Sequence, residues 1–173
     1  MSSVPKGRRK QHDFVATHNL IKLRKTITEL AISDFGYDRE KFEKKIEEFE
    51  RWSGNTEAAE RMRARNESYY TDFVEEETKV TRQILRETAA EYEMGNSIFP
   101  SGDTTMEEYK ERRLHLNRAI GHLHMLIQEM QYIADILPSD KNRYERLVEE
   151  IRQEIRLIKG VRRAANKFIK KQP

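Results

Sequence analysis

LNRAIGHLHMLIQEMQYIADIL, residues 116–137, is the most regular amphipathic segment of the chain and decides its fold class. Apolar residues recur here at steps of four and three, the spacing that places side chains on one face of an α-helix. They are Leu116, Ile120, Leu123, Ile127, Met130, Ala134 and Leu137. The pattern predicts a helix from about Thr104 to Leu137 with one buried face.

Three further segments show the same helical spacing. Residues 13–33, 56–94 and 140–169 each carry an apolar stripe, and glycine, proline or capping residues separate them. No segment alternates between apolar and polar residues with a period of two, so no sheet is expected. Four amphipathic helices joined by short breaks predict an all-α fold, an antiparallel up-down four-helix bundle.

The clearest break is GNSIFPSGD, residues 95–103. Gly95 can adopt the left-handed conformation that ends a helix, and Pro100 cannot continue one. We therefore expect the preceding helix to end near Met94. Its expected buried face consists of Val80, Ile84, Leu85, Ala89 and Tyr92.

Residues 37–72 form a helical insertion between the first and second core helices. The stretch DREKFEKKIEEFERW, residues 38–52, repeats apolar residues at helical spacing among alternating charges, and SGN at 53–55 interrupts it. Its aromatic residues Trp52, Tyr69 and Tyr70 are expected to be exposed. Two interpretations stay open, a helical hairpin that binds a partner and a solvated extension.

The composition is that of one intracellular helical domain. The chain has 173 residues, of which 36% are apolar and 36% charged, and no cysteine. No run of 18 apolar residues occurs, so a cytoplasmic protein without a membrane segment is expected. We expect a basic tail at 1–12, a single bundle domain at 13–169, and a basic tail at 170–173.

Both ends of the chain are basic, whereas the middle is net acidic although the whole carries a formal charge of +3. Up-down topology brings these ends together and puts the insertion at the opposite end. The predicted nucleic-acid-binding cations are Lys6, Arg8, Arg9, Lys10, Arg156, Lys159, Arg162, Arg163, Lys167, Lys170 and Lys171.

Favourable helix-dipole interactions are a simpler explanation for cations at a helix end. That effect contributes about 0.3–1 kcal/mol per charge and fades within one turn. The acid-free run starts at Arg156, more than three turns before the chain ends, and Lys159, Arg162 and Arg163 lie off the apolar stripe. This distribution favours a surface that neutralises phosphates.

Other chemistries have weaker support in the sequence. The histidines include no paired Glu-x-x-His motif of a di-iron bundle, so neither a metal site nor a cofactor is expected. Arg118 and His124 match the loose arginine-to-histidine spacing of a group of four-helix-bundle ribonucleases, although Ala119 stands where those enzymes usually have a polar residue. A structural scaffold of a phage or mobile element is a further alternative.

Three stretches together resemble a known family. SVPKGRRK at 3–10, RQILRETAAEYEMGNSIFP at 82–100 and RYERLVEEIRQEIRLIKGVRRA at 143–164 are similar to the accessory variability proteins of diversity-generating retroelements. That family is related to bundle proteins encoded in intervening sequences of bacterial large ribosomal RNA genes. The resemblance covers roughly residues 3–36 and 73–169.

The resemblance implies a basic homopentamer that is not an enzyme. Such a protein binds the reverse transcriptase of its element and the template RNA or RNA/DNA, and supports mutagenic cDNA synthesis. By position, the family's basic N-terminal segment matches the cations at 6–10, and its basic last helix matches Lys159, Arg162 and Arg163. The chain departs from the family in its insertion, and Gly95 stands where a small alanine is expected.

Overall fold

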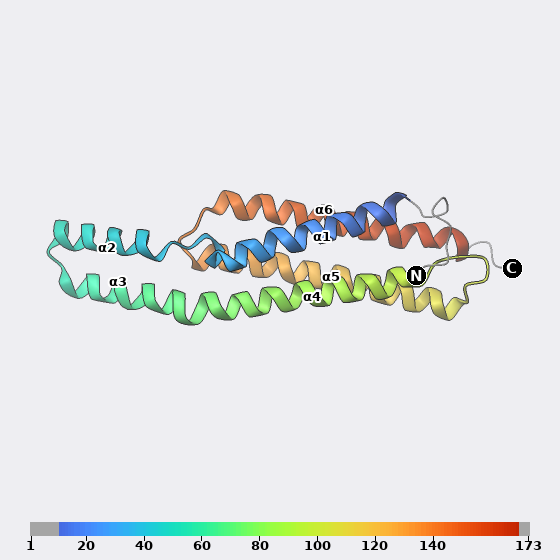
Figure 1. The fold of residues 1–173 in the computed structure, drawn as a ribbon, viewed down its shortest axis with the longest axis horizontal. Helices are drawn as coiled ribbons and strands as arrows, with labels where there is room; N and C mark the ends of the chain where they lie inside the picture. Colours follow the sequence, from blue (N-terminus) through green and yellow to red (C-terminus); the bar gives the residue numbers. More distant parts are fainter. Residues whose placement is uncertain (1–10, 170–173) are drawn as a thin grey trace.

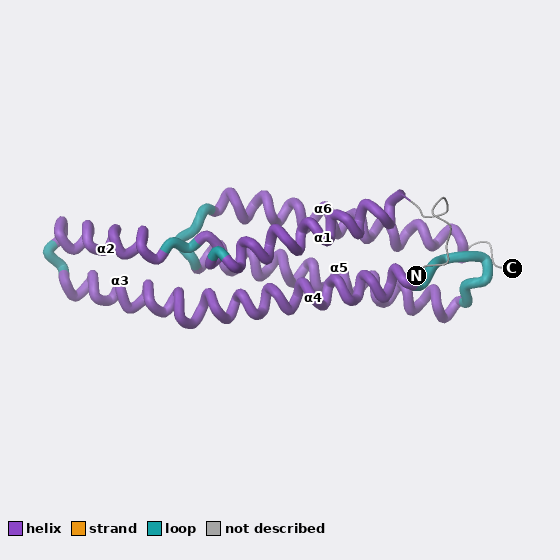
Figure 2. The backbone as a smooth tube through the Cα atoms, in the orientation of Figure 1, coloured by secondary structure: helices purple, strands orange, loops and turns teal. Residues whose placement is uncertain are grey.

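The computed structural model describes residues 11–169, and within that range every regular element is helical (Figure 2). Turns, loops and short connections make up the remainder. In chain order the elements are α1 (Gln11–Ile32), η2 (Asp34–Gly36), α2 (Arg39–Ser53), α3 (Thr56–Ser68), η3 (Tyr69–Val74), α4 (Glu75–Ser97), α5 (Met106–Ile136) and α6 (Lys141–Ile169).

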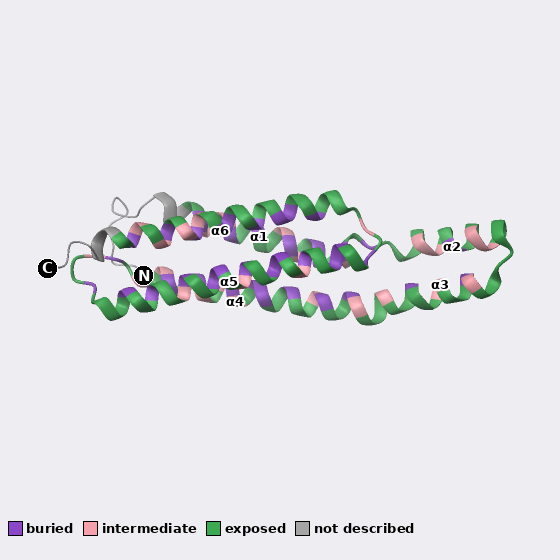
Figure 3. Cartoon of the chain, turned by 180° about the vertical axis from the view of Figure 1, so that it is seen from behind, coloured by how far each residue is buried: buried purple, intermediate pink, exposed green. Residues whose placement is uncertain are grey.

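Four helices, α1, α4, α5 and α6, lie side by side and share one apolar core, which we call the main core (Figure 1). Neighbouring contacts join α4 to α5, α5 to α6, α6 to α1 and α1 to α4. Purple buried positions line the facing sides of these helices in Figure 3. All seven residues of the stripe at 116–137 are buried, as predicted.

The ends of several helices gather at the two ends of the four-helix array. The start of α1, the end of α6 and the loop between α4 and α5 lie at one end of the molecule (Figure 1). Helices α2 and α3 extend beyond the opposite end. We call this pair the hairpin.

The turn between α1 and α2 has an unusual backbone. Asp34 and Phe35 have positive φ values of 51° and 55°, a region that favours glycine, and Gly36 follows with φ 77°. The Phe35 ring is fully buried, and the Tyr144 hydroxyl donates to the Phe35 carbonyl at 2.7 Å. Side-chain burial and this hydrogen bond thus hold the turn in its left-handed form.

The two helices of the hairpin are joined by both apolar and polar contacts. Ile46 and Ala59 are its buried apolar residues, whereas Arg63 bridges Glu43 at 2.8 Å and Glu50 at 2.7 Å. The two helices are therefore joined by a small apolar contact and by a charged network around one arginine.

Both helices of the hairpin also have defined ends. The Asp38 side chain caps the start of α2, and the Asn55 side chain caps the start of α3. Gly54, between the two helices, has φ 65° and ends α2 in the left-handed region. The sequence therefore specifies where the helices of the hairpin begin and where α2 ends.

The aromatic residues of the insertion divide into two groups. Trp52 is 86% exposed and Tyr70 is 43% exposed, as expected. The expectation for Tyr69 is wrong, because its ring is half-buried and packs edge-to-face on Tyr37 with 5.8 Å between ring centroids. Tyr37 is itself buried, donates to the Asn66 side chain, and has its pKa raised to about 12 by that burial. Tyr69 therefore belongs to the contact between hairpin and core.

Residues 56–97 form one continuous helical segment, as the absence of glycine and proline up to residue 94 predicts. The segment is not uniform, because residues 69–74 form a π-helix between α3 and α4. Val80 is 36% exposed, which corrects the prediction that it faces the core. Thr81 and Thr88 are buried on α4 instead, both at 0% exposure.

Gly95 does not end α4, contrary to the sequence prediction. The helix continues to Ser97, and Gly95 is buried against α5. A Cβ atom on Gly95 would lie 2.9 Å from Leu116 Cγ and 3.2 Å from the Arg112 carbonyl oxygen. The glycine is there because α4 and α5 approach closely at this point.

Two glutamates lie inside the helical array. Glu154 on α6 is 1% exposed, and burial raises its pKa to about 8. Glu77 on α4 is 8% exposed, and burial, followed by the nearby Glu129 carboxylate, raises its pKa to about 7. Both acids therefore favour the protonated form more strongly in the folded chain than in the unfolded chain.

Candidate nucleic-acid interface

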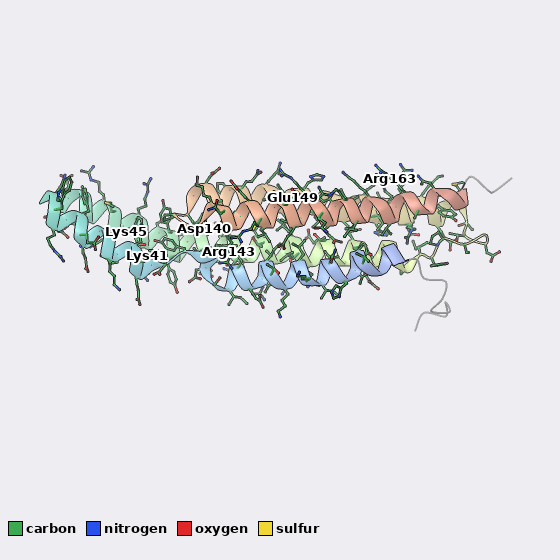
Figure 4. The ribbon with its side chains drawn as sticks, turned by 90° about the horizontal axis from the view of Figure 1, so that it is seen from above. Lys41, Lys45, Asp140, Arg143, Glu149 and Arg163 are labelled. Carbon is green, nitrogen blue, oxygen red and sulfur yellow. The ribbon has the colours of Figure 1, made fainter. Side chains whose placement is uncertain are left out.

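The last turns of α6 present three cations along one edge of the molecule. Lys159 and Arg162 are half-buried and Arg163 is exposed, and Arg163 is labelled in Figure 4. Among the side chains that the structure describes, no acid lies within ion-pair distance of any of the three. Their charge is therefore available to an external anion.

Arg156 differs from these three, although the sequence groups it with them. Its Nη2 donates to Glu149 Oε1 at 2.7 Å, two turns earlier on α6. The hydrogen bond from Arg156 is the main reason that the pKa of Glu149 is lowered. Glu149, which precedes the acid-free run, thus neutralises part of the charge of Arg156. The prediction that Arg156 is a free phosphate ligand is corrected accordingly.

Arg113 on α5 is a cation that the sequence prediction missed. A shallow groove between α5 and α6 is lined by Arg113, Arg162 and Asn166, among others. Arg113 is exposed, and Arg162 also donates to the Asn117 side chain on α5. The sequence signal was available, because Arg113 and Asn117 are four residues apart and share one face of α5.

The other predicted binding residues fall beyond the part of the chain that the structure describes. The side chain of Lys167 is one of them, and six whole residues are the others: Lys6, Arg8, Arg9, Lys10, Lys170 and Lys171. The interface described below consists of Arg113, Lys159, Arg162 and Arg163, which we call the α5–α6 cations.

Arg112 lies next to Arg113 but has a different role. It is 2% exposed, and its Nη1 donates to the Ile98 carbonyl at 2.9 Å and also to the Gly95 carbonyl. These are acceptors at the C-terminal end of α4, where backbone carbonyls lack helical partners. Arg112 thus fixes the end of α4 against α5, beside the groove that contains Arg113.

The opposite edge of α5 carries histidines that pair with acids of α4. His115 Nδ1 lies 2.6 Å from Glu91 Oε2, and His122 Nδ1 lies 3.5 Å from Glu87 Oε2. These pairs explain why the two histidines share one face of α5. Among residues 11–169, no group of three or more His, Cys, Asp or Glu side chains is arranged to hold a metal ion.

Arg118 and His124, the proposed ribonuclease pair, do not come together in the chain. Arg118 faces α4, with its Nη1 3.7 Å from Glu91 Oε1. His124 is exposed and follows Asn117 by seven residues, which places it on the edge that faces α6. The two side chains therefore leave α5 toward different neighbours.

Comparisons with family models, with curated proteins and with solved structures found no match to the chain. Within residues 11–169, none of the helices combines the length and the apolar character needed to cross a membrane.

Proposed function

We propose that this chain is a noncatalytic, nucleic-acid-binding accessory subunit of a reverse transcriptase in a diversity-generating retroelement. The observation that carries the proposal is the group of α5–α6 cations, Arg113, Lys159, Arg162 and Arg163, which have no acidic partner among the described residues. Positive side chains grouped on one edge suit the phosphate backbone of RNA or an RNA/DNA hybrid. The resemblance of the three sequence stretches supplies the biological setting.

We interpret α1, α4, α5 and α6 as an antiparallel up-down four-helix bundle, and α2 with α3 as an insertion into it. The alternating contacts of these four helices around the main core support this interpretation.

We further propose that the chain forms a homo-oligomer and is cytoplasmic. The outer face of α5 carries an exposed apolar stripe of Leu114, Met125, Tyr132 and Ile136, between 36% and 50% exposed. Apolar stripes of this kind are typical of protein interfaces. A homo-oligomer, a pentamer by the resemblance, would cover that stripe.

RNA binding tests the role of the α5–α6 cations. The variant Arg162→Glu with Arg163→Glu should bind template RNA more weakly than the wild type in fluorescence anisotropy. The slope of log affinity against log salt should fall by about 0.7 for each phosphate of single-stranded RNA that the variant no longer neutralises. The double variant Lys44→Glu with Arg51→Glu changes the charge equally on the hairpin and is the matched control.

An unchanged affinity in the Arg162→Glu, Arg163→Glu variant, with unchanged circular dichroism, would show that these cations do not bind RNA. Copurification with a retroelement reverse transcriptase tests the partner separately. RNA cleavage that disappears in His124→Ala would contradict the noncatalytic assignment.

A further inference from the structure

A pocket lies where the hairpin meets the main core, at the end of the main core far from the α5–α6 cations. Its volume is about 280 Å³, and three segments line it: the turn after α1, the start of α2, and the connection between α5 and α6. This volume is just below the ~300–1,000 Å³ typical of small-molecule sites. We call it the junction pocket.

Two lysines line the junction pocket, and an arginine lies beside it. Lys41 and Lys45 line it from α2, are both exposed, and lie one helical turn apart on the same face. Arg143 Nη1 lies 3.5 Å from the position that a Cβ on Gly36 would take, and Gly36 lines the pocket. Figure 4 shows these cations at the junction. Among the described side chains, none of the three cations has an acid within ion-pair distance.

Two carboxylates also line the junction pocket, and each already accepts a backbone N–H. Asp38 accepts from the Lys41 amide at 2.9 Å, and Asp140 accepts from the Asn142 amide at 3.0 Å. A carboxylate has further lone pairs, so each can still accept from a ligand hydroxyl or amine. The lining thus holds two lysines and two aspartates, and Arg143 beside Gly36 adds one further positive charge at the edge of the pocket.

Part of the remaining wall is apolar. Phe42 is half-buried and packs against the main core, and Pro138 lies across the pocket from α2. An aromatic ring and a proline ring suit a flat organic group. The pocket thus combines sites for an anion, for hydroxyl donors and for a planar ring.

We propose that the junction pocket binds a nucleoside monophosphate. Lys41 and Lys45, with Arg143 at the edge, hold the phosphate, because cations and phosphate oxygens form charge-assisted hydrogen bonds. Asp38 and Asp140 accept from the ribose hydroxyls, and the base packs on Phe42 and Pro138. A bound nucleotide joins α2 to the connection between α5 and α6.

Equilibrium dialysis with radiolabelled AMP tests this proposal on the full chain. Wild type should bind AMP saturably, and Lys41→Ala or Lys45→Ala should weaken binding by about tenfold or more, as expected for one charged hydrogen bond. Lys44→Ala is the matched control, since Lys44 is exposed on the same helix but does not line the pocket. Its affinity should equal that of the wild type.

The ligand itself is tested with AMP fragments. Adenosine, which lacks the phosphate, should bind at least about tenfold more weakly than AMP, because it cannot form the charged hydrogen bonds to the lysines. Ribose 5-phosphate should fall between them. Absence of saturable AMP binding at millimolar concentration, or an equal weakening in Lys44→Ala and Lys45→Ala, would overturn the site. Inorganic phosphate that binds as tightly as AMP would overturn the assignment to a nucleotide.

This inference is independent of the proposed RNA interface. The Arg162→Glu, Arg163→Glu variant should keep its AMP affinity, because those residues lie at the opposite end of the molecule (Figure 4). An absence of AMP binding in that variant would move the nucleotide site from the junction pocket to α6 and contradict the proposal.

Discussion

Gly95 is a structurally important residue, but for a different reason from the one that the sequence predicts. A glycine before an asparagine and a proline-containing loop is a common helix ending, and the sequence favours that interpretation. In the structure the residue is helical and its missing side chain is what lets α5 approach α4. An alanine, the residue expected from the resemblance, would meet Leu116 and the Arg112 backbone at this point.

Gly95→Ala should therefore destabilise the protein, by about 1–3 kcal/mol as is usual for overpacking in a core. Gly160→Ala is the control, because Gly160 is exposed in α6 and a Cβ there meets no atom within 4 Å. That control should stabilise the helix by about 0.5–1 kcal/mol. Urea unfolding measures both, and equal effects of the same sign would contradict the close-approach explanation.

Glu154 couples stability to pH, and the direction follows from its raised pKa. A carboxyl whose pKa is about 8 in the folded chain binds its proton more tightly there than in the unfolded chain, where the ordinary value is 4.5. Its stabilising contribution is complete below pH 4.5 and is lost as the pH rises to 8. Each pKa unit corresponds to about 1.4 kcal/mol.

Glu154→Gln removes this titration. Between about pH 5 and pH 8.5, the free energy of unfolding of the wild type should fall more than that of the variant, when both are measured by urea unfolding. The free energy of unfolding of the variant should still depend on pH, although less than that of the wild type, because the pKa of Glu77 is also raised, to about 7. Parallel pH profiles for the two proteins would mean that Glu154 is not protonated in the folded state.

At the scale of elements, the π-helix at 69–74 is the least expected feature. A π-helical turn contains one more residue than an α-helical turn, so it absorbs an extra residue without shifting the faces of the helices on either side. Tyr69 packs on Tyr37 before the π-helix ends, and Phe73 packs on Tyr132 with 5.5 Å between ring centroids. The extra residue thus keeps both the hairpin and the core in register.

Deleting the exposed Thr71 should convert the π-helix to an ordinary α-helix and change the urea midpoint little. Deleting the exposed Arg86 from α4 is the matched control, because it rotates every later residue by about 100° and turns the apolar face away from the core. The control should unfold or lose most of its stability. Similar destabilisation in both deletions would show that the π-helix does not serve as a register adjustment.

How far the elements could be predicted depends on the physical origin of each. The helices and their apolar stripes follow from local spacing, so 116–137 and the α1 stripe were predictable. The π-helix and the buried threonines of α4 depend on contacts with distant residues, which periodicity does not contain.

In the interface, the cations of α6 were predictable as a group. The partner of Arg156 and the contribution of Arg113 required the placement of side chains.

At the scale of the whole molecule, the apolar stripe on the outer face of α5 is the feature on which the proposed self-association rests. Leu114, Met125, Tyr132 and Ile136 follow one another at helical spacing, and the exposed Gly121 lies among them. A glycine in such a stripe lets another helix approach closely. The stripe runs along α5, so a second chain seated there would lie lengthwise on the main core.

Met125→Glu should therefore shift the protein toward the monomer in sedimentation equilibrium, since it puts a charge into the centre of the stripe. Gln153→Glu, an exposed change on α6, is the control and should leave the assembly state unchanged. A wild-type protein that is monomeric at all concentrations would contradict the proposed oligomer.

The uninterrupted path from α3 through η3 into α4 gives the hairpin a mechanical property. A projection joined by a loop dissipates a pull at its tip, whereas this one continues into a helix that borders the main core. A force applied near Trp52 at the tip would therefore be transmitted along this segment toward the contact between Tyr37 and Tyr69.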